Sequence, residues 1–364
     1  MLRFHWRLPQ GGEQANASRA SQVGFTDAGL PDLDVQVPFS RTAEQCGIDS
    51  LLIDFGWSKP DPILLAAALG MATTKMRFII AHRSGLICPT SFVQQMNTLA
   101  TLIAGRFSLN IVAGHSPAEQ RGYGDNLPHD ERYERTAEYL SVCHALWKDS
   151  HDVSFRGKYY EIEHARLNTP FASADRTFPE IYIAGNSPAA RRVSISQGSC
   201  WMRLPDLPEK VAGEVGPVLA SGKEVGLRFA IVSRPTRREA IDAARALAAS
   251  AGTRFDDRTA ESEFIKRSDS LSMKAVHELA SEEWLSPVLW TGAVRSHGAA
   301  ALALVGAPEE IASAILEYAR AGVSQFIFSG WPKLDEMRFF GSCILPLVRE
   351  QERQVLVPAI AGAK

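Results

Sequence analysis

Long apolar runs and an excess of charge of either sign are both missing from this 364-residue sequence. No stretch approaches the roughly 18 consecutive apolar residues of a membrane-spanning helix. The first residues, MLRFHWRLPQGGE, lack the apolar segment of a secretory signal. Lysine and arginine number 39 against 41 aspartates and glutamates, so no basic surface for nucleic acid is expected. Together these absences predict a globular, cytoplasmic protein.

Cysteine pairs and the short motifs of several enzyme classes are missing as well. The five cysteines are scattered without CxxC spacing, which is typical of reduced thiols and not of disulfides or a zinc site. The sequence has no HExxH, no GxSxG and no GxxxxGK followed by Ser or Thr. A bound organic cofactor is therefore expected, rather than a metal ion or a serine nucleophile.

Short apolar, β-branched runs alternate with amphipathic stretches of helical length along nearly the whole chain. Runs such as RFIIAH and SQFIFSG are apolar almost throughout, which is typical of parallel strands buried on both faces. Eight strands, each followed by a helix, predict an α/β fold, the (β/α)8 TIM barrel; a doubly wound open sheet is the rival. The predicted strands are Leu2–Leu8, Ser50–Asp54, Met76–His82, Phe107–Ala113, Glu180–Gly185, Ser199–Met202, Leu227–Ser233 and Ser324–Gly330, and the predicted helices are Val35–Cys46, Pro62–Met71, Ser91–Ile103, Glu131–Trp147, Pro188–Gln197, Pro208–Ala220, Thr236–Ala249, Glu309–Ala321 and Leu334–Arg349.

Two long segments interrupt this alternation. Residues 148–178 precede the fifth strand, and the charged segment 251–306 comes before the last helix-strand pair. Long connections in compact domains are usually functional, so we interpret 251–306 as a lid over the catalytic face; a solvated helical insertion is the alternative. The prediction is one barrel domain over residues 1–350, followed by a C-terminal tail at 351–364.

Cationic and short polar residues gather at the carboxyl ends of the predicted strands, where the catalytic face of a barrel lies. This composition favours an anionic ligand. Two histidines follow strands, as a general acid or base would, although a structural histidine is the commoner case. The residues concerned are Asp54, Lys59, His82, Arg83, Ser84, Asn110 to His115, Gly185, Asn186, Ser187, Arg203, Ser233, Arg234 and Trp331, with Arg295 in the predicted lid.

The segment IYIAGNSPAARR is the most informative local motif. A buried strand runs into Gly-Asn-Ser and then into a helix that begins at Pro188. Exposed N–H groups, the helix dipole and the Ser187 hydroxyl together form a cradle for an anion such as a phosphate. The alternative is an ordinary turn in which Asn186 or Ser187 only caps the helix.

A second motif, LPHDERYERTAEYL, marks a helix start. Asp130 is a good N-cap residue, and Glu131 and Glu134 suit the first turn. Arg132 and Tyr133 either reach towards the barrel mouth or pack the helix on its neighbour.

Five segments in order, spanning nearly the whole chain, resemble the bacterial luciferase-like flavin-dependent monooxygenases, and the alkanesulfonate monooxygenase branch above all. They are GRFSLNIVAGHSPAEQRGYGDNLPHDERYERTAEYL, FRGKYYEIEHARLNTP, PEIYIAGNSPAARR, GAVRSHGAAALALVGAPEEIA and FIFSGWPKLDEMRFFG. Members of this family are (β/α)8 barrels that use reduced FMN, supplied by a separate NAD(P)H:FMN reductase. In the family the flavin reacts with O2 to give a flavin (hydro)peroxide, which oxygenates the substrate.

The resemblance implies positions for the cofactor. It places the FMN phosphate at Gly185, Asn186 and Ser187, with Tyr133 nearby. It also implies that the isoalloxazine ring lies near His82, Asn110 and Ala113. Arg295 matches an arginine that the sulfonate-cleaving enzymes carry on a mobile loop.

The chain departs from the desulfonating enzymes around the substrate. They have a histidine where Gly11 stands, a cysteine where Lys59 stands and a tyrosine where Trp331 stands. An ungapped comparison puts Val232 and Arg234 where they have an arginine and a histidine. The flavin positions survive while the substrate positions change, which favours a retained cofactor and a changed substrate or oxygenation step.

The leading hypothesis is a two-component, reduced-FMN-dependent monooxygenase that acts on a small anionic organic molecule, with a lean towards organosulfur compounds. The expected catalytic residues are Arg295, Arg234, Lys59, His82 and Trp331, and the expected substrate contacts are Trp6, Arg203, Arg234, Arg295 and Trp331. The alternatives are a deazaflavin-dependent hydride-transfer enzyme and a flavin-binding barrel without activity. The resemblance also implies a homodimer or homotetramer, and a flavin reductase as partner.

Overall fold

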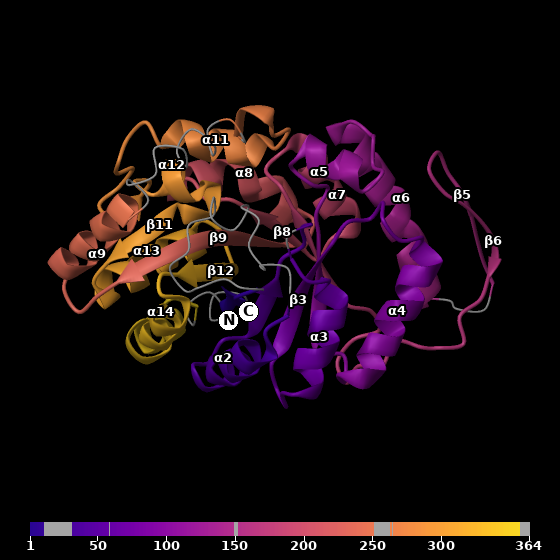
Figure 1. The fold of residues 1–364 in the computed structure, drawn as a ribbon, viewed down its shortest axis with the longest axis horizontal. Helices are drawn as coiled ribbons and strands as arrows, with labels where there is room; N and C mark the ends of the chain where they lie inside the picture. The colour runs from indigo at the N-terminus through magenta and orange to yellow at the C-terminus, as the bar shows by residue number, and fades with distance from the viewer. Residues whose placement is uncertain (11–30, 58, 149–151, 251–262, 264, 357–364) are drawn as a thin grey trace, which may run out of the picture.

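Parallel strands close into a barrel, as predicted (Figure 1). The computed structural model describes residues 1–10, 31–57, 59–148, 152–250, 263 and 265–356. Strand β1 pairs with both β2 and β12, and β8 pairs with β9, so the sheet has no free edge within the barrel. In order around the barrel the strands are β1 (Arg3–Arg7), β2 (Ser50–Ile53), β3 (Arg77–His82), β4 (Phe107–Ile111), β7 (Glu180–Ala184), β8 (Cys200–Arg203), β9 (Glu224–Ser233) and β12 (Gln325–Gly330).

The barrel helices begin and end close to the predicted bounds, because their ends carry strong local signals. Asp32 and Asp61 cap two of them through their carboxylates, and Pro62, Pro188 and Pro208 each occupy a first turn. The helices around the barrel are α2 (Leu33–Gln45), α3 (Pro62–Met71), α4 (Pro89–Leu102), α6 (His129–Lys148), α7 (Pro188–Gln197), α8 (Pro208–Ala220), α9 (Arg237–Ser250), α13 (Pro308–Arg320), α14 (Lys333–Phe339) and α15 (Leu345–Leu356), with a short π-helical turn between the last two.

Side chains of each barrel strand alternate between the barrel interior and the surrounding helices. Leu52, Ile79, Met202 and Ile327 belong to an apolar cluster inside the barrel. Trp6 faces the other way and is fully buried, with ring centroids 6.1 Å from Phe328 and 5.7 Å from Phe340. The alternation therefore decides which residue at each strand end reaches the catalytic face.

The two long connections have structure of their own. The first carries a hairpin, β5 (Val153–Arg156) and β6 (Glu161–Ala165), which projects beyond α6 (Figure 1). The described part of the second contains α11 (Leu271–Leu279), β10 (Leu289–Trp290), α12 (Val294–His297) and β11 (Ala303–Gly306). Strand β11 extends the sheet, because it pairs in parallel with the last four residues of β9. The predicted lid thus ends in a strand rather than in a loop.

The C-terminal helix also extends further than predicted. Helix α15 runs to Leu356, although the expected helix ended at Arg349 and a tail began at 351. Buried Glu352 accepts a hydrogen bond from the backbone N–H of Leu2, and Arg349 donates to the carbonyl of Leu2 over 2.7 Å. Arg349 and Glu352 of α15 therefore hold the start of β1. Within the described part of the chain, none of the helices has the length and apolar character required to cross a membrane.

Candidate active site

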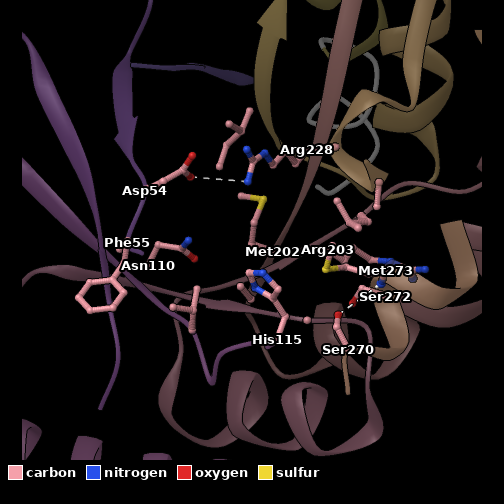
Figure 2. Close-up of a pocket in the computed structure, with 18 of the residues that line it drawn as sticks. Asp54, Phe55, Asn110, His115, Met202, Arg203, Arg228, Ser270, Ser272 and Met273 are labelled. Atoms are coloured by element: carbon pink, nitrogen blue, oxygen red, sulfur yellow. Dashed lines mark hydrogen bonds and ion pairs between the residues drawn. The ribbon is translucent and has the colours of Figure 1, made fainter. Parts of the chain in front are cut away.

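A cavity of about 310 Å³ opens at the carboxyl ends of the strands, the face on which barrel enzymes carry their chemistry (Figure 2). Its walls come from the ends of β1, β2, β3, β4, β7, β8 and β12, from Arg228 in the middle of β9 and from the N-terminal turn of α11. The predicted residues that line it are Asp54, Lys59, Arg83, Asn110, Val112, Ala113, Gly114, His115, Tyr133, Gly185, Asn186, Ser187, Arg203 and Trp331. The described residues hold no cluster of His, Cys, Asp or Glu suited to a metal ion.

The turn between β7 and α7 forms one end of the cavity. Gly185 has a φ of +129°, and a Cβ added there would lie 2.5 Å from the hydroxyl of Tyr133. That hydroxyl donates to the carbonyl of Ala184 over 2.8 Å. Ser187 caps α7 by accepting from the N–H of Ala190 over 3.1 Å and also lines the cavity. The capping interpretation is therefore confirmed, and the anion-cradle interpretation stays a prediction; we keep the name cradle for residues 185–187.

Several contacts hold this cradle rigidly. The indole N–H of Trp201 donates to the carbonyl of Gly185 over 2.6 Å. The side chain of Asn186 accepts from the N–H of Leu204 over 3.1 Å and donates to its carbonyl over 3.3 Å. Because these partners belong to β8 and its following loop, the turn has little freedom to change shape.

The first turn of α11 covers the cradle. Ser270 caps this helix, and the hydroxyl of Ser272 accepts the N–H of Asn186 over 2.8 Å. The preceding residues are anchored as well: Asp269 pairs with Arg132 at 2.6 Å, and Ser268 donates to the carbonyl of His115 over 2.7 Å. Part of the segment predicted as a lid therefore lies over the cavity, whereas residues 251–262 and 264 fall outside the described part of the chain.

At the opposite end of the cavity, three cationic side chains surround the carboxylate of Asp54. Arg7 donates to it over 2.5 Å, and the nitrogens of Arg228 and Lys59 lie 3.7 and 3.9 Å from its oxygens. Burial raises the pKa of Asp54, but Arg7, Arg228 and Lys59 outweigh burial and hold this pKa well below its ordinary value. We refer to Arg7, Asp54, Lys59 and Arg228 as the cationic cluster.

The wall between the two ends carries polar and aromatic groups. Asn110 is buried, and its side-chain oxygen has no hydrogen-bond partner among the described residues. Arg83 is anchored by Glu119 over 2.6 Å, and its guanidinium carbon lies 4.8 Å from the ring centre of Phe55. Such a wall offers a planar ligand both an acceptor and an apolar surface.

His82 was expected beside the flavin, but the structure turns it away from the cavity. It follows Ala81 in β3, and Ala81 is the residue that lines the cavity. The His82 ring stacks on Phe92 at 4.0 Å and shares a 3.0 Å hydrogen bond with Tyr139. Burial lowers the pKa of His82 to about 3, so this side chain is neutral in the core at physiological pH.

Trp6 also lies outside the cavity. Side chains alternate along β1, and its neighbour Arg7 is the residue that points inward. Arg228 in β9 lines the cavity, whereas Val232 of the same strand packs in a small apolar cluster. Arg234, the residue after β9, forms an ion pair with buried Glu336. Burial raises the pKa of Glu336 to about 7, although Arg234 opposes this shift. Arg234 therefore lies outside the cavity that it was expected to line.

Arg295 also lies away from the cavity. Its side chain is exposed and donates to the carbonyl of Ala280 over 3.0 Å. His297, two residues later in the predicted lid, is buried and lines the cavity instead, and its ring centre lies 6.0 Å from that of Trp331.

In the motif LPHDERYERTAEYL, α6 begins at His129, one residue before the predicted cap at Asp130.

The cavity residues that were missed at the level of sequence include Arg7, Arg228, Ser272 and His297. Arg7 carried a usable signal, because in RFHWR the apolar residues Phe4 and Trp6 alternate with Arg3, His5 and Arg7. Ser272 carried none, since its position depends on how the lid folds back.

A parallel barrel with a polar, partly covered cavity at its carboxyl face has the architecture of a barrel enzyme. The family model of the luciferase-like monooxygenases matches residues 3–325, and the chain belongs to that family.

Solved structures share the fold at low sequence identity. A riboflavin lyase, RcaE, crystallised with modified FMN and riboflavin, has a TM-score of 0.76 at 20% identity, covering 97% of this chain and 92% of the other. The EDTA monooxygenase EmoA from Chelativorans sp. BNC1 has a TM-score of 0.75 at 18% identity, covering 96% and 94%. An F420-dependent secondary alcohol dehydrogenase has a TM-score of 0.65 at 18% identity, covering 95% and 99%.

Proposed function

We propose that this protein is a two-component monooxygenase that uses reduced FMN and O2 to oxygenate a small anionic organic molecule. The observation that carries the proposal is the polarity of the cavity. An anion cradle forms one end and the cationic cluster forms the other, and Asn110 and Phe55 also line the cavity, on the side of Asp54 in Figure 2.

The residues present fit the cofactor. A phosphate suits the cradle, because Gly185 keeps the space clear of a Cβ while Ser187 marks the positive end of α7. Gly185, Asn186, Ser187 and Tyr133 would hold the phosphate, and Asn110 and Ala113 would flank the ring. Reduced flavin, when bound, supplies the electrons that activate O2.

The cationic cluster suits the acidic group of the substrate. Arg228 reaches the cavity from β9 and Lys59 from the segment after β2, and Asp54 holds them in place. Lys59 would also stabilise negative charge that develops during oxygenation, and Trp331 with His297 would form the wall beside the reacting carbon or sulfur. Sulfonates and other organosulfur acids are the substrate class we favour.

Exclusion of water is the contribution of the lid. Ser272 and Met273 cover the phosphate end, and the ion pair between Asp269 and Arg132 holds them there. A covered site protects a reactive oxidant from discharge by solvent. The proposal includes a cytoplasmic location, a homodimer or homotetramer, and an NAD(P)H:FMN reductase as the source of reduced flavin.

The solved structures leave a second candidate, hydride transfer with a deazaflavin. An F420-dependent alcohol dehydrogenase and an F420-dependent tetrahydromethanopterin reductase share the fold, with TM-scores of 0.65 and 0.64. The two functions differ in their need for oxygen.

Anaerobic titration with reduced FMN and, separately, with reduced F420 tests the choice. We expect reduced FMN to bind more tightly, and admission of 18O2 with a panel of small sulfonates and carboxylates to give a labelled product. A preference for F420, with substrate turnover under argon, would replace the proposal by the second candidate.

A further inference from the structure

The guanidinium of Arg203 lies at the phosphate end of the cavity, although the sequence suggested a role in substrate binding. Arg203 closes β8 and lines the cavity with only 3% of its surface exposed. Its Nε has no hydrogen-bond partner among the described residues. A buried guanidinium donor without an acceptor is costly, so this arrangement points to an acceptor supplied by a ligand.

Two neighbours fix the orientation of Arg203. Its guanidinium carbon lies 5.0 Å from the ring centre of Trp201, and its Nη1 lies 2.6 Å from a carboxylate oxygen of Glu214 on α8. Trp201 and Arg203 share one side of β8, whereas Met202 between them faces the barrel interior. The guanidinium is therefore held against a flat surface, and little side-chain entropy is lost when it binds an anion.

Two residues close to Arg203 in the sequence contact the cradle. Trp201 donates to the carbonyl of Gly185, and Leu204, the residue after Arg203, exchanges two hydrogen bonds with the side chain of Asn186. In Figure 2, Arg203 lies near Ser272 and Met273, on the far side of the cavity from Asp54. Arg203 thus accompanies the cradle and is separated from the cationic cluster.

We propose that Arg203 recognises the phosphate of the flavin and makes this cavity select FMN over unphosphorylated riboflavin. This inference rests on the proposed function, in which a flavin occupies the cavity. The end of α7 supplies N–H groups and a partial positive charge, and Arg203 adds a full charge whose hydrogen bonds to a phosphate are stronger than neutral ones. Riboflavin has a hydroxyl in place of the phosphate and gains little from that charge.

Equilibrium binding of FMN and riboflavin to the full-length protein tests the assignment without any turnover. Flavin fluorescence quenching would give both dissociation constants for the wild type and for Arg203→Met. We expect the variant to lose about ten- to a hundredfold in FMN affinity, while its riboflavin affinity stays within about twofold. Arg156→Met is the matched control, because Arg156 is 79% exposed on the β5–β6 hairpin.

Two further variants guard against a folding defect in Arg203→Met. Arg203→Lys keeps the charge without the planar donors, and we expect it to restore part of the FMN preference. Glu214→Gln keeps the guanidinium and removes its carboxylate partner, and FMN should then bind as tightly as in the wild type or more tightly. An unchanged ratio of FMN to riboflavin affinity in both Arg203 variants would overturn the inference.

Failure of the proposed function gives a different result. If the wild type binds neither flavin, the flavin proposal fails, and inorganic phosphate becomes the probe of Arg203. A rise in melting temperature with phosphate in the wild type and in Arg156→Met, but not in Arg203→Met, would still support an anion site at Arg203. No effect of phosphate on any variant would overturn both proposals.

Discussion

The two ends of the cavity are built in different ways, although we propose an anionic group for both. The end proposed for the phosphate is made of backbone groups and short side chains from one turn, Gly185 to Ser187, supported by the adjacent strand. The opposite end is made of long charged side chains from β1, β9 and the segment after β2. A site made of backbone is fixed by local folding, whereas a site made of long side chains is fixed by their mutual charges. Substitutions at the two ends should therefore have different consequences.

The largest effect is expected from Gly185→Ala at the phosphate end. The new Cβ would lie 2.5 Å from the Tyr133 hydroxyl, at a backbone φ that alanine rarely adopts. We expect FMN binding to be lost and the free energy of unfolding to fall by about 1–3 kcal/mol, measured by fluorescence titration and urea denaturation. Gly213→Ala on α8 is the control, because a Cβ added there would meet no neighbouring described atom within 4 Å. Normal FMN affinity in Gly185→Ala would show that the cradle does not hold the cofactor.

Arg228→Met should affect the other end without affecting the cofactor. Loss of a charged hydrogen-bond donor to the substrate should lower kcat/KM by about ten- to a hundredfold, while the dissociation constant of FMN stays unchanged. Steady-state kinetics and flavin titration on the same preparation separate these outcomes. Equal losses of FMN affinity and turnover would mean that the cluster and the cradle are not separate sites.

Asp54→Asn should reveal the charge balance of the cationic cluster as a dependence of stability on pH. The folded-state pKa of Asp54 lies below the unfolded value of about 3.9, so its carboxylate stabilises the fold at neutral pH, and this contribution is lost as pH falls below about 4 towards the folded pKa. We expect the variant to be less stable by about 2 kcal/mol at pH 7, and the difference from the wild type to shrink in acid.

Urea denaturation of both proteins between pH 7 and pH 3 measures this difference. A gap that stays constant down to pH 3 would indicate that the Asp54 carboxylate does not stabilise the cluster through its charge.

The smallest effect is expected from Arg295→Ala. The exposed side chain bonds a carbonyl of its own segment and points away from the cavity, so kcat should change by less than about threefold. His297→Ala removes the nearby ring that does line the cavity and should lower kcat more. A large loss in Arg295→Ala with a small one in His297→Ala would restore the interpretation of Arg295 as a substrate clamp.

The difference between the two ends also explains what could be predicted from the sequence. The barrel was predictable because most of its strands contain short apolar runs and several helices begin at Asp or Pro. The turn from Gly185 to Ser187 was predictable because its residues are consecutive. The cationic cluster was not, since Arg7 and Arg228 meet only when β1 and β9 close the barrel on either side of β12.

His82 and Trp6 were predicted to face the cavity, and each is one position away from the residue of its strand that does so. Ala81 and Arg7 face the cavity, so His82 and Trp6 cannot, and an error of one position moves a side chain to the opposite face of the sheet. Arg234 was placed by its position after a predicted strand, and Arg295 by the predicted lid and by resemblance. Their actual partners, Glu336 and the carbonyl of Ala280, depend on packing that no local pattern encodes.

The lid is attached unequally at its two ends. At its C-terminal end, β11 is bonded to the barrel along the last four residues of β9, the strand that also carries Arg228. Near α11 the described attachment consists of the ion pair of Arg132 with Asp269, a few hydrogen bonds of Ser268, Asp269 and Ser272, and the core packing of Met273 and Val276. A strand pairing therefore holds the C-terminal end of the lid, whereas side-chain contacts hold the end near α11. We expect any opening to begin at Asp269, which would uncover the end of the cavity at Gly185 to Ser187 before the end at Asp54.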